Sequence, residues 1–465
     1  MLALMKSNPL IERYLFSILR PSRLYTSIIL YIGLLMVIFI INLTISIAGH
    51  YDNASQLCRS IFVQFTVFQA VVFWLWIPNN CFAAIRDEVT EKSYDFFKML
   101  PLSASQKTWG ILVGKNAAAL AVGAVNFIIM LFVVPLSAIS IWFFIQLFVL
   151  IITSSLLAAS LMLLVSLNST HKKKTNSNMA VIIPIVFVGP WLFGFIANIF
   201  RNNELESATG KFFVFSLPLL TLLSCLTIYF TAWTLKGLSR KFNKENEPLM
   251  NGTGALLFFA GAQVVTLGLF WNTLDSTVGF CGFLTTSASV LFTVPLFSML
   301  KLEHYLEILG AQSASSNRNQ LTASLLKNSN ISLDLLLMAV WIGFAAAAAI
   351  ISVSPFITHL LGTIAMLFLI VLLGSLLKEI YCLFRFSLFL VLFVSAVIIV
   401  VPMVLGAVFE SKTISWFSPL GFFVNMTSGF VPSAALFYGV LCIIPAMFVI
   451  QKYKTTINSR FPKSV

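Results

Sequence analysis

Twelve apolar stretches, each close to the length of a membrane-crossing helix, constrain this chain more than any other feature. A helix needs about 20 apolar residues to cross the hydrocarbon core of a bilayer. The stretches cover residues 24–48, 60–84, 110–134, 141–167, 179–200, 212–235, 252–271, 278–300, 332–353, 357–377, 386–409 and 433–451. Charged residues make up only 10% of the 465 positions, against about 25% in a soluble domain. The sequence therefore predicts an all-α, polytopic transmembrane bundle of twelve spans.

The distribution of Lys and Arg predicts how these spans are oriented. With the amino terminus placed in the cytoplasm, 25 of the 29 Lys and Arg residues fall on the cytoplasmic side, and only Arg59, Arg201, Lys211 and Lys412 fall outside. Membrane proteins keep this excess of positive charge inside. We therefore expect an integral protein of the cell membrane with both termini in the cytoplasm. The net charge of +13 then reflects topology and contact with lipid, so it predicts no nucleic-acid partner.

The chain divides by sequence into two related halves of six spans, residues 1–245 and 246–465. Residues 211–219 parallel residues 412–420, since both segments begin with Lys and end in Pro-Leu. Each segment is followed by a last span and a basic tail. Duplication of a six-span unit produces this order, and chance similarity between apolar segments is the alternative explanation.

A short amphipathic segment precedes the first span. Between residues 9 and 19 the apolar side chains of Leu10, Tyr14, Leu15 and Ile18 form one stripe. This pattern is typical of a helix that lies in the membrane interface, with a plain amphipathic tail as the alternative.

A charged segment at residues 85–115 interrupts the apolar sequence after the second span. Apolar residues recur there at helical spacing, which predicts an amphipathic helix over 85–100 with a charged, solvated face. Pro101 ends this helix because the residue before a proline disfavours the α region, and Ser103 or Ser105 can cap the next helix. The charged residues are Arg86, Asp87, Glu88, Glu91, Lys92, Asp95 and Lys98. A solvated loop between two spans is the simpler interpretation.

The order of these elements resembles the permease subunits of type-2 ABC transporters. The Pro-Leu-Ser at 101–103 and the Gly-Lys at 114–115 match the pattern of that family, whereas its usual Gly-Thr-Leu-Glu is replaced here by Ser-Tyr-Asp-Phe at 93–96. In that family the charged helix docks on a separate ATP-hydrolysing subunit. The resemblance implies that the seven charged residues dock such a subunit, present in two copies, and that ATP and Mg²⁺ bind to that subunit. It also implies half-membrane hairpins before the last span of each half.

The corresponding loop of the second half, residues 301–330, is different. It keeps Glu303, His304 and Glu307 but lacks the Pro-Leu-Ser and Gly-Lys elements, and it continues into a stretch rich in Ser, Asn and Gln. This composition predicts either a weaker second docking helix or a flexible linker.

Catalytic and metal chemistry have little support in the residues. The Gly-rich segment 110–115 superficially suggests a phosphate-binding loop, but its spacing is short, Asn116 replaces Ser or Thr, and it opens a membrane helix. The six cysteines and four histidines are scattered without metal-ligand spacing. The sequence therefore predicts no metal site, no cofactor in this chain and no enzyme activity of its own. A membrane enzyme would need an acid/base or metal cluster, which the sequence does not offer.

A twelve-span secondary transporter driven by an ion gradient, or a lipid flippase, is the alternative to an ABC-type exporter. An ion-coupled transporter needs ionisable groups within its spans, and the spans offer mainly Asp334 and His359, each near one end of its stretch. Uncharged polar residues could line a path or simply join helices by hydrogen bonds: Gln64, Gln69, Asn126, Gln146, Asn198 and Gln263. The sequence favours the membrane-spanning subunit of an ABC-type exporter and leaves its substrate open.

Overall fold

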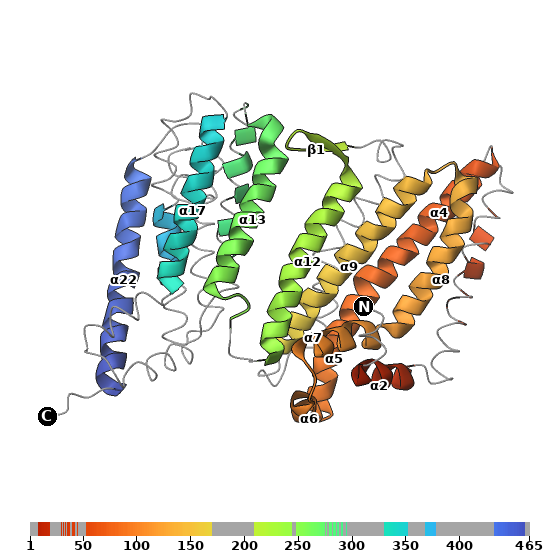
Figure 1. Cartoon of the computed structure of the whole chain (residues 1–465), viewed down its shortest axis with the longest axis horizontal. Helices are drawn as coiled ribbons and strands as arrows, with labels where there is room; N and C mark the ends of the chain where they lie inside the picture. The colour runs from red at the N-terminus through yellow and green to blue at the C-terminus, as the bar shows by residue number, and fades with distance from the viewer. Residues whose placement is uncertain are drawn as a thin grey trace. The chain divides into compact units, whose positions relative to one another are not determined.

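The computed structural model describes residues 8–18, 53–169, 209–243, 248–274, 330–351, 368–377 and 432–460, together with scattered positions between 29 and 44 and between 276 and 294. Within these residues the protein is helical apart from one short β-hairpin (Figure 1). The elements are α2 (Pro9–Ile18), α4 (Ala54–Val71), η1 (Val72–Trp76), α5 (Ile77–Thr90), α6 (Tyr94–Met99), α7 (Ala104–Trp109), η2 (Gly110–Lys115), α8 (Ala117–Val133), η3 (Val134–Ser137), α9 (Ile141–Ser169), β1 (Thr209–Phe212), β2 (Phe215–Pro218), α12 (Leu219–Asn243), α13 (Gly252–Phe270), η4 (Trp271–Thr273), α17 (Asn330–Ile351) and α22 (Pro432–Arg460).

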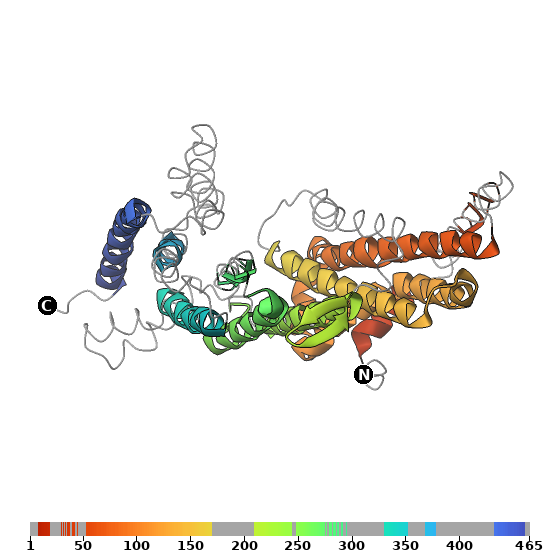
Figure 2. The same ribbon diagram turned by 90° about the horizontal axis from the view of Figure 1, so that it is seen from above.

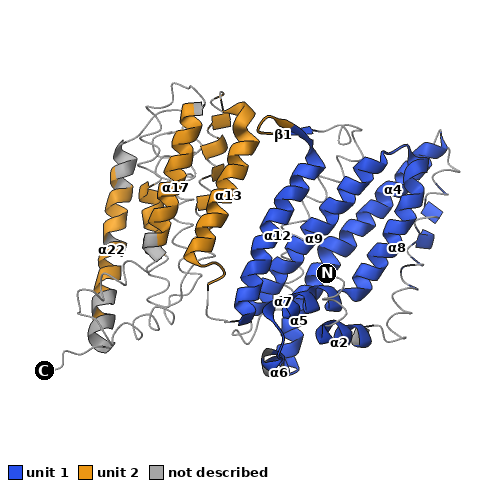
Figure 3. Cartoon of the chain, viewed as in Figure 1, with its two compact units in different colours: residues 1–210, 216–245 blue, residues 211–215, 246–465 orange. Residues whose placement is uncertain are grey.

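Two compact units divide the chain (Figure 3). The first comprises residues 1–210 and 216–245, and the second comprises residues 211–215 and 246–465. In the first unit α9 packs along both α5 and α12, while α4 packs against α8 (Figures 1 and 2). In the second unit α13 packs against α17. The descent of the two units from one duplicated ancestor stays a prediction.

Six of the described helices are long and apolar enough to cross a membrane: Ala54–Thr90, Ala117–Ser137, Ile141–Leu167, Leu219–Asn243, Gly252–Thr273 and Leu333–Ile350. The predictions of an all-α architecture and of an integral membrane protein are therefore confirmed. The predicted spans 179–200 and 386–409 lie outside the described residues, and 24–48, 278–300 and 357–377 lie there in part. The count of twelve spans and the orientation of the termini stay predictions.

The second predicted span is part of a much longer helix. Elements α4, η1 and α5 form one continuous rod of 37 residues, from Ala54 to Thr90. At 1.5 Å per residue such a rod is about 55 Å long, whereas the hydrocarbon core is about 30 Å thick. The rod is therefore longer than a perpendicular crossing needs, and three consecutive charged residues, Arg86, Asp87 and Glu88, lie near one end of it.

A π-helical turn interrupts the rod where the sequence places a proline. The N–H of Ile77 bonds to the carbonyl of Val72, the wide spacing of a π turn. The next carbonyl along, that of Phe73, would need the N–H of Pro78, which proline lacks. Ser155 of α9 supplies the missing donor, with its hydroxyl 2.6 Å from the Phe73 oxygen. The sequence thus sets the bulge, and the neighbouring helix satisfies it.

Strands β1 and β2 form a two-stranded hairpin directly before α12. The resemblance implied half-membrane hairpins here and at 412–420. The first is now seen to be a short β-hairpin, and the second lies outside the described residues.

Three of the polar side chains predicted to lie inside the spans join helices. Asn126 of α8 donates to the Gln69 side chain at 2.6 Å and to the Phe65 carbonyl at 3.1 Å, both on α4. Gln263 of α13 donates to the Ser287 carbonyl at 3.1 Å. These buried bonds favour the packing interpretation for all three of these residues. Asn198 lies outside the described residues.

Candidate functional site

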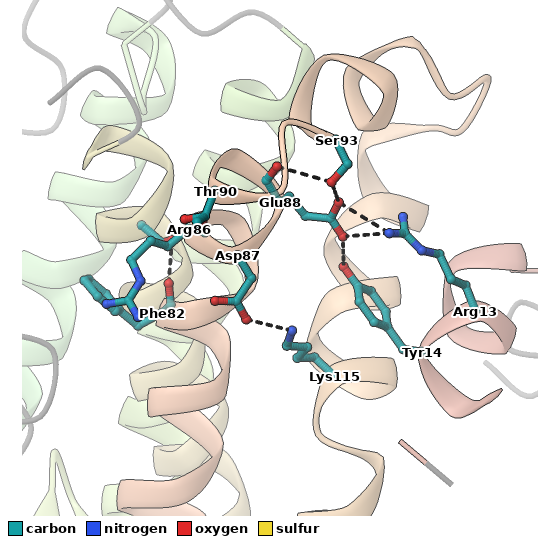
Figure 4. Close-up of polar contacts among 10 residues, drawn as sticks. Arg13, Tyr14, Phe82, Arg86, Asp87, Glu88, Thr90, Ser93 and Lys115 are labelled. Atoms are coloured by element: carbon teal, nitrogen blue, oxygen red, sulfur yellow. Dashed lines mark hydrogen bonds and ion pairs between the residues drawn. The ribbon is translucent and has the colours of Figure 1, made fainter. Parts of the chain in front are cut away.

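The candidate site lies at the C-terminal end of α5. Three consecutive charged residues, Arg86, Asp87 and Glu88, occupy its last turns. Successive residues are about 100° apart around a helix, so their side chains point in three different directions (Figure 4). Arg86 is half-buried, Asp87 is directed toward Lys115, and Glu88 is buried.

Glu88 is the centre of a hydrogen-bonded cluster (Figure 4). One carboxylate oxygen accepts the Tyr14 hydroxyl at 3.2 Å and lies 3.3 Å from the Arg13 guanidinium. The other accepts the Ser93 hydroxyl at 2.5 Å. A carboxylate only 4% exposed is tolerated when it is paired with a charge and fully hydrogen-bonded. Burial and the adjacent carboxylate raise the pKa of the Tyr14 hydroxyl, so Tyr14 stays a donor.

The helix ends immediately after this cluster, at Thr90. Lys92 adopts φ +57°, the N–H of Ser93 bonds to the Glu88 carbonyl at 2.9 Å, and the N–H of Lys92 bonds to the Val89 carbonyl at 3.2 Å. These two bonds define a Schellman motif, the usual end of a helix. The predicted single helix over 85–100 is therefore wrong. It is two helices, α5 and α6, joined by a turn that the sequence did not signal because Lys stands where Gly is usual.

The Phe97 side chain anchors helix α6 to the bundle. Phe97 is only 1% exposed. Its ring lies 6.4 Å from the ring of Tyr94 and 6.1 Å from that of Phe242 of α12, and the Lys107 ammonium lies 5.7 Å from its centroid. Burial lowers the pKa of Lys107. In contrast, Met99 at the end of α6 is 79% exposed.

The segment after α6 follows the prediction closely. The helix ends at Met99, before Pro101. The Ser103 hydroxyl then caps α7 in a capping box with Gln106, accepting the Gln106 N–H at 3.2 Å. Of the two cap candidates, Ser103 is the one used.

Helix α2 packs against the corner that is formed by α5, the turn at residues 91–93 and α6. Asn8 donates to the Gln106 carbonyl at 2.7 Å, and the helix lies so close to η2 that glycine is required beneath it. A Cβ on Gly110 would stand 2.8 Å from the Cβ of Leu10, and one on Gly114 would stand 3.0 Å from the Tyr14 ring. Lys115, next to the second glycine, forms an ion pair with Asp87 at 3.0 Å. The Gly-Lys element at 114–115 is thus part of the surface on which α2 packs.

The structure gives different surroundings to four of the seven predicted docking residues, Asp87, Glu88, Glu91 and Lys92. Glu88 is buried and holds the corner together, which contradicts the prediction of one uniformly solvated face, whereas the Asp87 side chain is 41% exposed and pairs with Lys115. Glu91 and Lys92 are exposed at the turn. Asp95 and Lys98 lie on α6, but their side chains are outside the described residues, as are Glu303, His304 and Glu307 entirely.

Sequence reasoning missed three partners in this cluster: Arg13, Tyr14 and Ser93. The stripe containing Tyr14 predicted a helix in the membrane interface. The structure instead buries Leu10 and Tyr14 against η2 of the same chain.

No family model, no curated protein and no solved structure matches this chain. The resemblance to type-2 ABC permeases therefore stays a prediction that rests on residues 85–115.

Proposed function

We propose that this protein is the membrane-spanning subunit of an ABC-type exporter, moving a substrate with ATP that a separate subunit hydrolyses. The observation that carries the proposal is the corner formed by α5, the turn at residues 91–93 and α6. It lies at the charged end of a 37-residue helix that is longer than a membrane crossing needs, and it is tied to the bundle on its inner side. ATP and Mg²⁺ would bind to the partner, present in two copies.

The contacts within the corner suit the transmission of force from a docked subunit to the membrane helices. Its inner side is held by the buried Glu88 cluster, by Phe97 and by the ion pair between Asp87 and Lys115. A displacement applied to the turn would therefore move the helix rod, since neither α5 nor α6 can rotate without breaking these contacts.

The outer side of the corner offers a surface of mixed character. Glu91 and Lys92 are exposed and opposite in charge, and Met99 is an exposed apolar side chain nearby in the chain. An apolar centre with charged groups around it is typical of a protein interface. We therefore assign docking to the exposed turn and α6, and assign a supporting role to Asp87 and Glu88.

Recovery of the partner tests the proposal directly. The tagged chain, purified from its native membranes, should bring down an ATP-binding protein identifiable by mass spectrometry. The double reversal Glu91→Lys with Lys92→Glu should reduce that recovery several-fold, because each exposed pair contributes roughly 0.2–1 kcal/mol. Lys211→Glu, at an exposed position in the hairpin, is the control and should leave recovery unchanged. Equal recovery with all variants, or the absence of any ATP-binding protein, would refute the proposal.

An ion-coupled secondary transporter or lipid flippase is the second candidate, because a carboxylate is buried near one end of a span. Asp334 of α17 is 1% exposed and accepts the Ser375 hydroxyl at 2.7 Å. Buried carboxylates in spans often belong to proton or ion relays. If Asp334→Asn and collapse of the ion gradients each abolish transport at constant ATP, this candidate replaces the first. His359 lies outside the described residues.

A further inference from the structure

The turn of the β-hairpin presents two apolar side chains outward. Val214 is 84% exposed and Phe215 is 70% exposed. A hairpin turn is usually built of Gly, Asn or Asp, so a turn reading Phe-Val followed by Phe is unusual for one surrounded by water.

The backbone at this turn is held in a conformation that its sequence disfavours. Phe213 has φ +51°, in the left-handed region that bulky residues rarely adopt. Such residues persist only where neighbouring structure imposes the conformation, and they concentrate at functional positions.

The end of α13 imposes it. The Phe213 N–H donates to the Gly268 carbonyl at 2.8 Å, and Asn272 donates to the Phe213 carbonyl at 2.5 Å. The Phe213 ring lies 5.3 Å from that of Trp271. A Cβ on Gly268 would stand 2.7 Å from the rings of Phe212 and Phe213, so glycine makes this close approach possible. Phe213 is thereby turned toward α13, which leaves Val214 and Phe215 facing away.

These bonds also fix the depth of the turn. Gly268 lies in the last turn of α13, which ends at Phe270, and α13 is one of the helices able to cross a membrane. The hairpin turn therefore lies level with the end of a span. That is the depth of the bilayer interface, where aromatic side chains concentrate. Hairpin backbone cannot enter the hydrocarbon itself, because its unpaired edge groups would find no hydrogen-bond partners there.

We propose that Val214 and Phe215 insert into the lipid interface at the membrane face where α13 ends, so that the hairpin anchors the start of α12 in the bilayer. Two side chains offer at most about 500 Å² of surface, whereas a stable protein interface needs about 800 Å² from each partner. Lipid is therefore a better match than a second protein. This inference does not depend on an ATP-binding partner.

Photo-crosslinking tests the proposal with little change to the side chain. The full chain, with p-benzoylphenylalanine in place of Phe215, is reconstituted into vesicles of phosphatidylcholine and phosphatidylglycerol, illuminated and analysed by mass spectrometry. We expect adducts whose added mass is that of a phospholipid, at least about fivefold more abundant than with the same photo-reactive residue in place of Glu91, an exposed position at the α5 turn.

A backbone variant tests whether α13 sets the depth. Gly268→Ala, which crowds Phe212 and Phe213, should displace the turn and reduce the lipid adduct at position 215 several-fold. Gly343→Ala is the matched control, because a Cβ there meets no atom within 4 Å. The proposal is overturned if lipid adducts are equally abundant at positions 215 and 91, if adducts at 215 join a protein instead, or if Gly268→Ala leaves the lipid adduct undiminished.

Discussion

Two tight turns of this protein contain a bulky residue in the left-handed region, and their surroundings are opposite in chemistry. At the end of α5, Lys92 has φ +57°, and in the β-hairpin, Phe213 has φ +51°. The first turn lies beside a buried carboxylate with hydroxyl and guanidinium partners. The second lies beside Trp271 and the backbone of α13.

The difference indicates which medium each turn meets. The α5 turn exposes Glu91 and Lys92, which suit contact with water or a soluble subunit. The hairpin exposes Val214 and Phe215, which suit lipid. The left-handed backbone conformation is thus held by polar bonds at the α5 turn and by aromatic packing at the hairpin turn. The side chains that each turn exposes suit the medium that it faces.

The largest effect should come from removing the aromatic anchor of the α5 turn. Phe97→Ala should destabilise this corner by about 3–5 kcal/mol, because it leaves a cavity among Tyr94, Phe242 and Lys107. Hydrogen exchange of peptides from residues 86–101 measures the loss, and Met99→Ala, at an exposed position, should change exchange little. Similar exchange in both variants would show that Phe97 does not hold α6.

A smaller effect is expected from the carboxylate at the same turn. Glu88→Ala should reduce the free energy of unfolding by about 2–3 kcal/mol, because it removes the charged group that accepts the Tyr14 and Ser93 hydroxyls and pairs with Arg13. Glu88→Gln, which retains an acceptor oxygen, should cost less. Thermal unfolding in detergent compares the two, and equal losses would assign the effect to packing instead of hydrogen bonding.

The hairpin should respond more weakly to loss of a polar bond. Asn272→Ala removes the donor to the Phe213 carbonyl and should cost about 1 kcal/mol, read as faster exchange of residues 209–218. Thr273→Ala, whose hydroxyl bonds only within its own helix end, serves as the comparison. A loss as large as that of Glu88→Ala would erase the contrast between the two turns.

The smallest expected effect is a gain in stability, from a substitution at Lys92. Lys92→Gly relieves the left-handed strain at an exposed position, and this relief exceeds the added chain entropy of glycine by about 0.5 kcal/mol. Glu91→Gly, one residue earlier in the right-handed region at φ −78°, should instead destabilise. Slower exchange with Lys92→Gly and faster exchange with Glu91→Gly would confirm that the turn stores strain.

Much of the fold follows from the sequence by direct physical rules. Apolar length predicted the helices beginning at Ile141, Gly252 and Asn330, because only a helix satisfies its own backbone in lipid. Pro101 predicted the end of α6, and the pair Ser103 and Ser105 predicted the start of α7, since such residues act through their immediate neighbours. The structure decided that Ser103 is the cap.

The sequence predicted the candidate site only in part. The sequence marked residues 85–115 as exceptional, yet it could not divide them into supporting and exposed members. Whether Glu88 faces water or protein depends on Tyr14 and Arg13, which are about 75 positions away in the chain. The Gly-Lys element was recognised, but its physical purpose required knowing that α2 lies on Gly110 and Gly114.

The sequence by itself determined the long apolar helices and the end of α6 before Pro101, because each depends on residues within a few positions of one another. The tertiary structure alone decided the burial of Glu88, the division of the docking helix in two and the left-handed turns at Lys92 and Phe213. The physical reason is that a carboxylate is stable in the interior, and a strained φ persists, only when distant segments supply the partners that compensate for them.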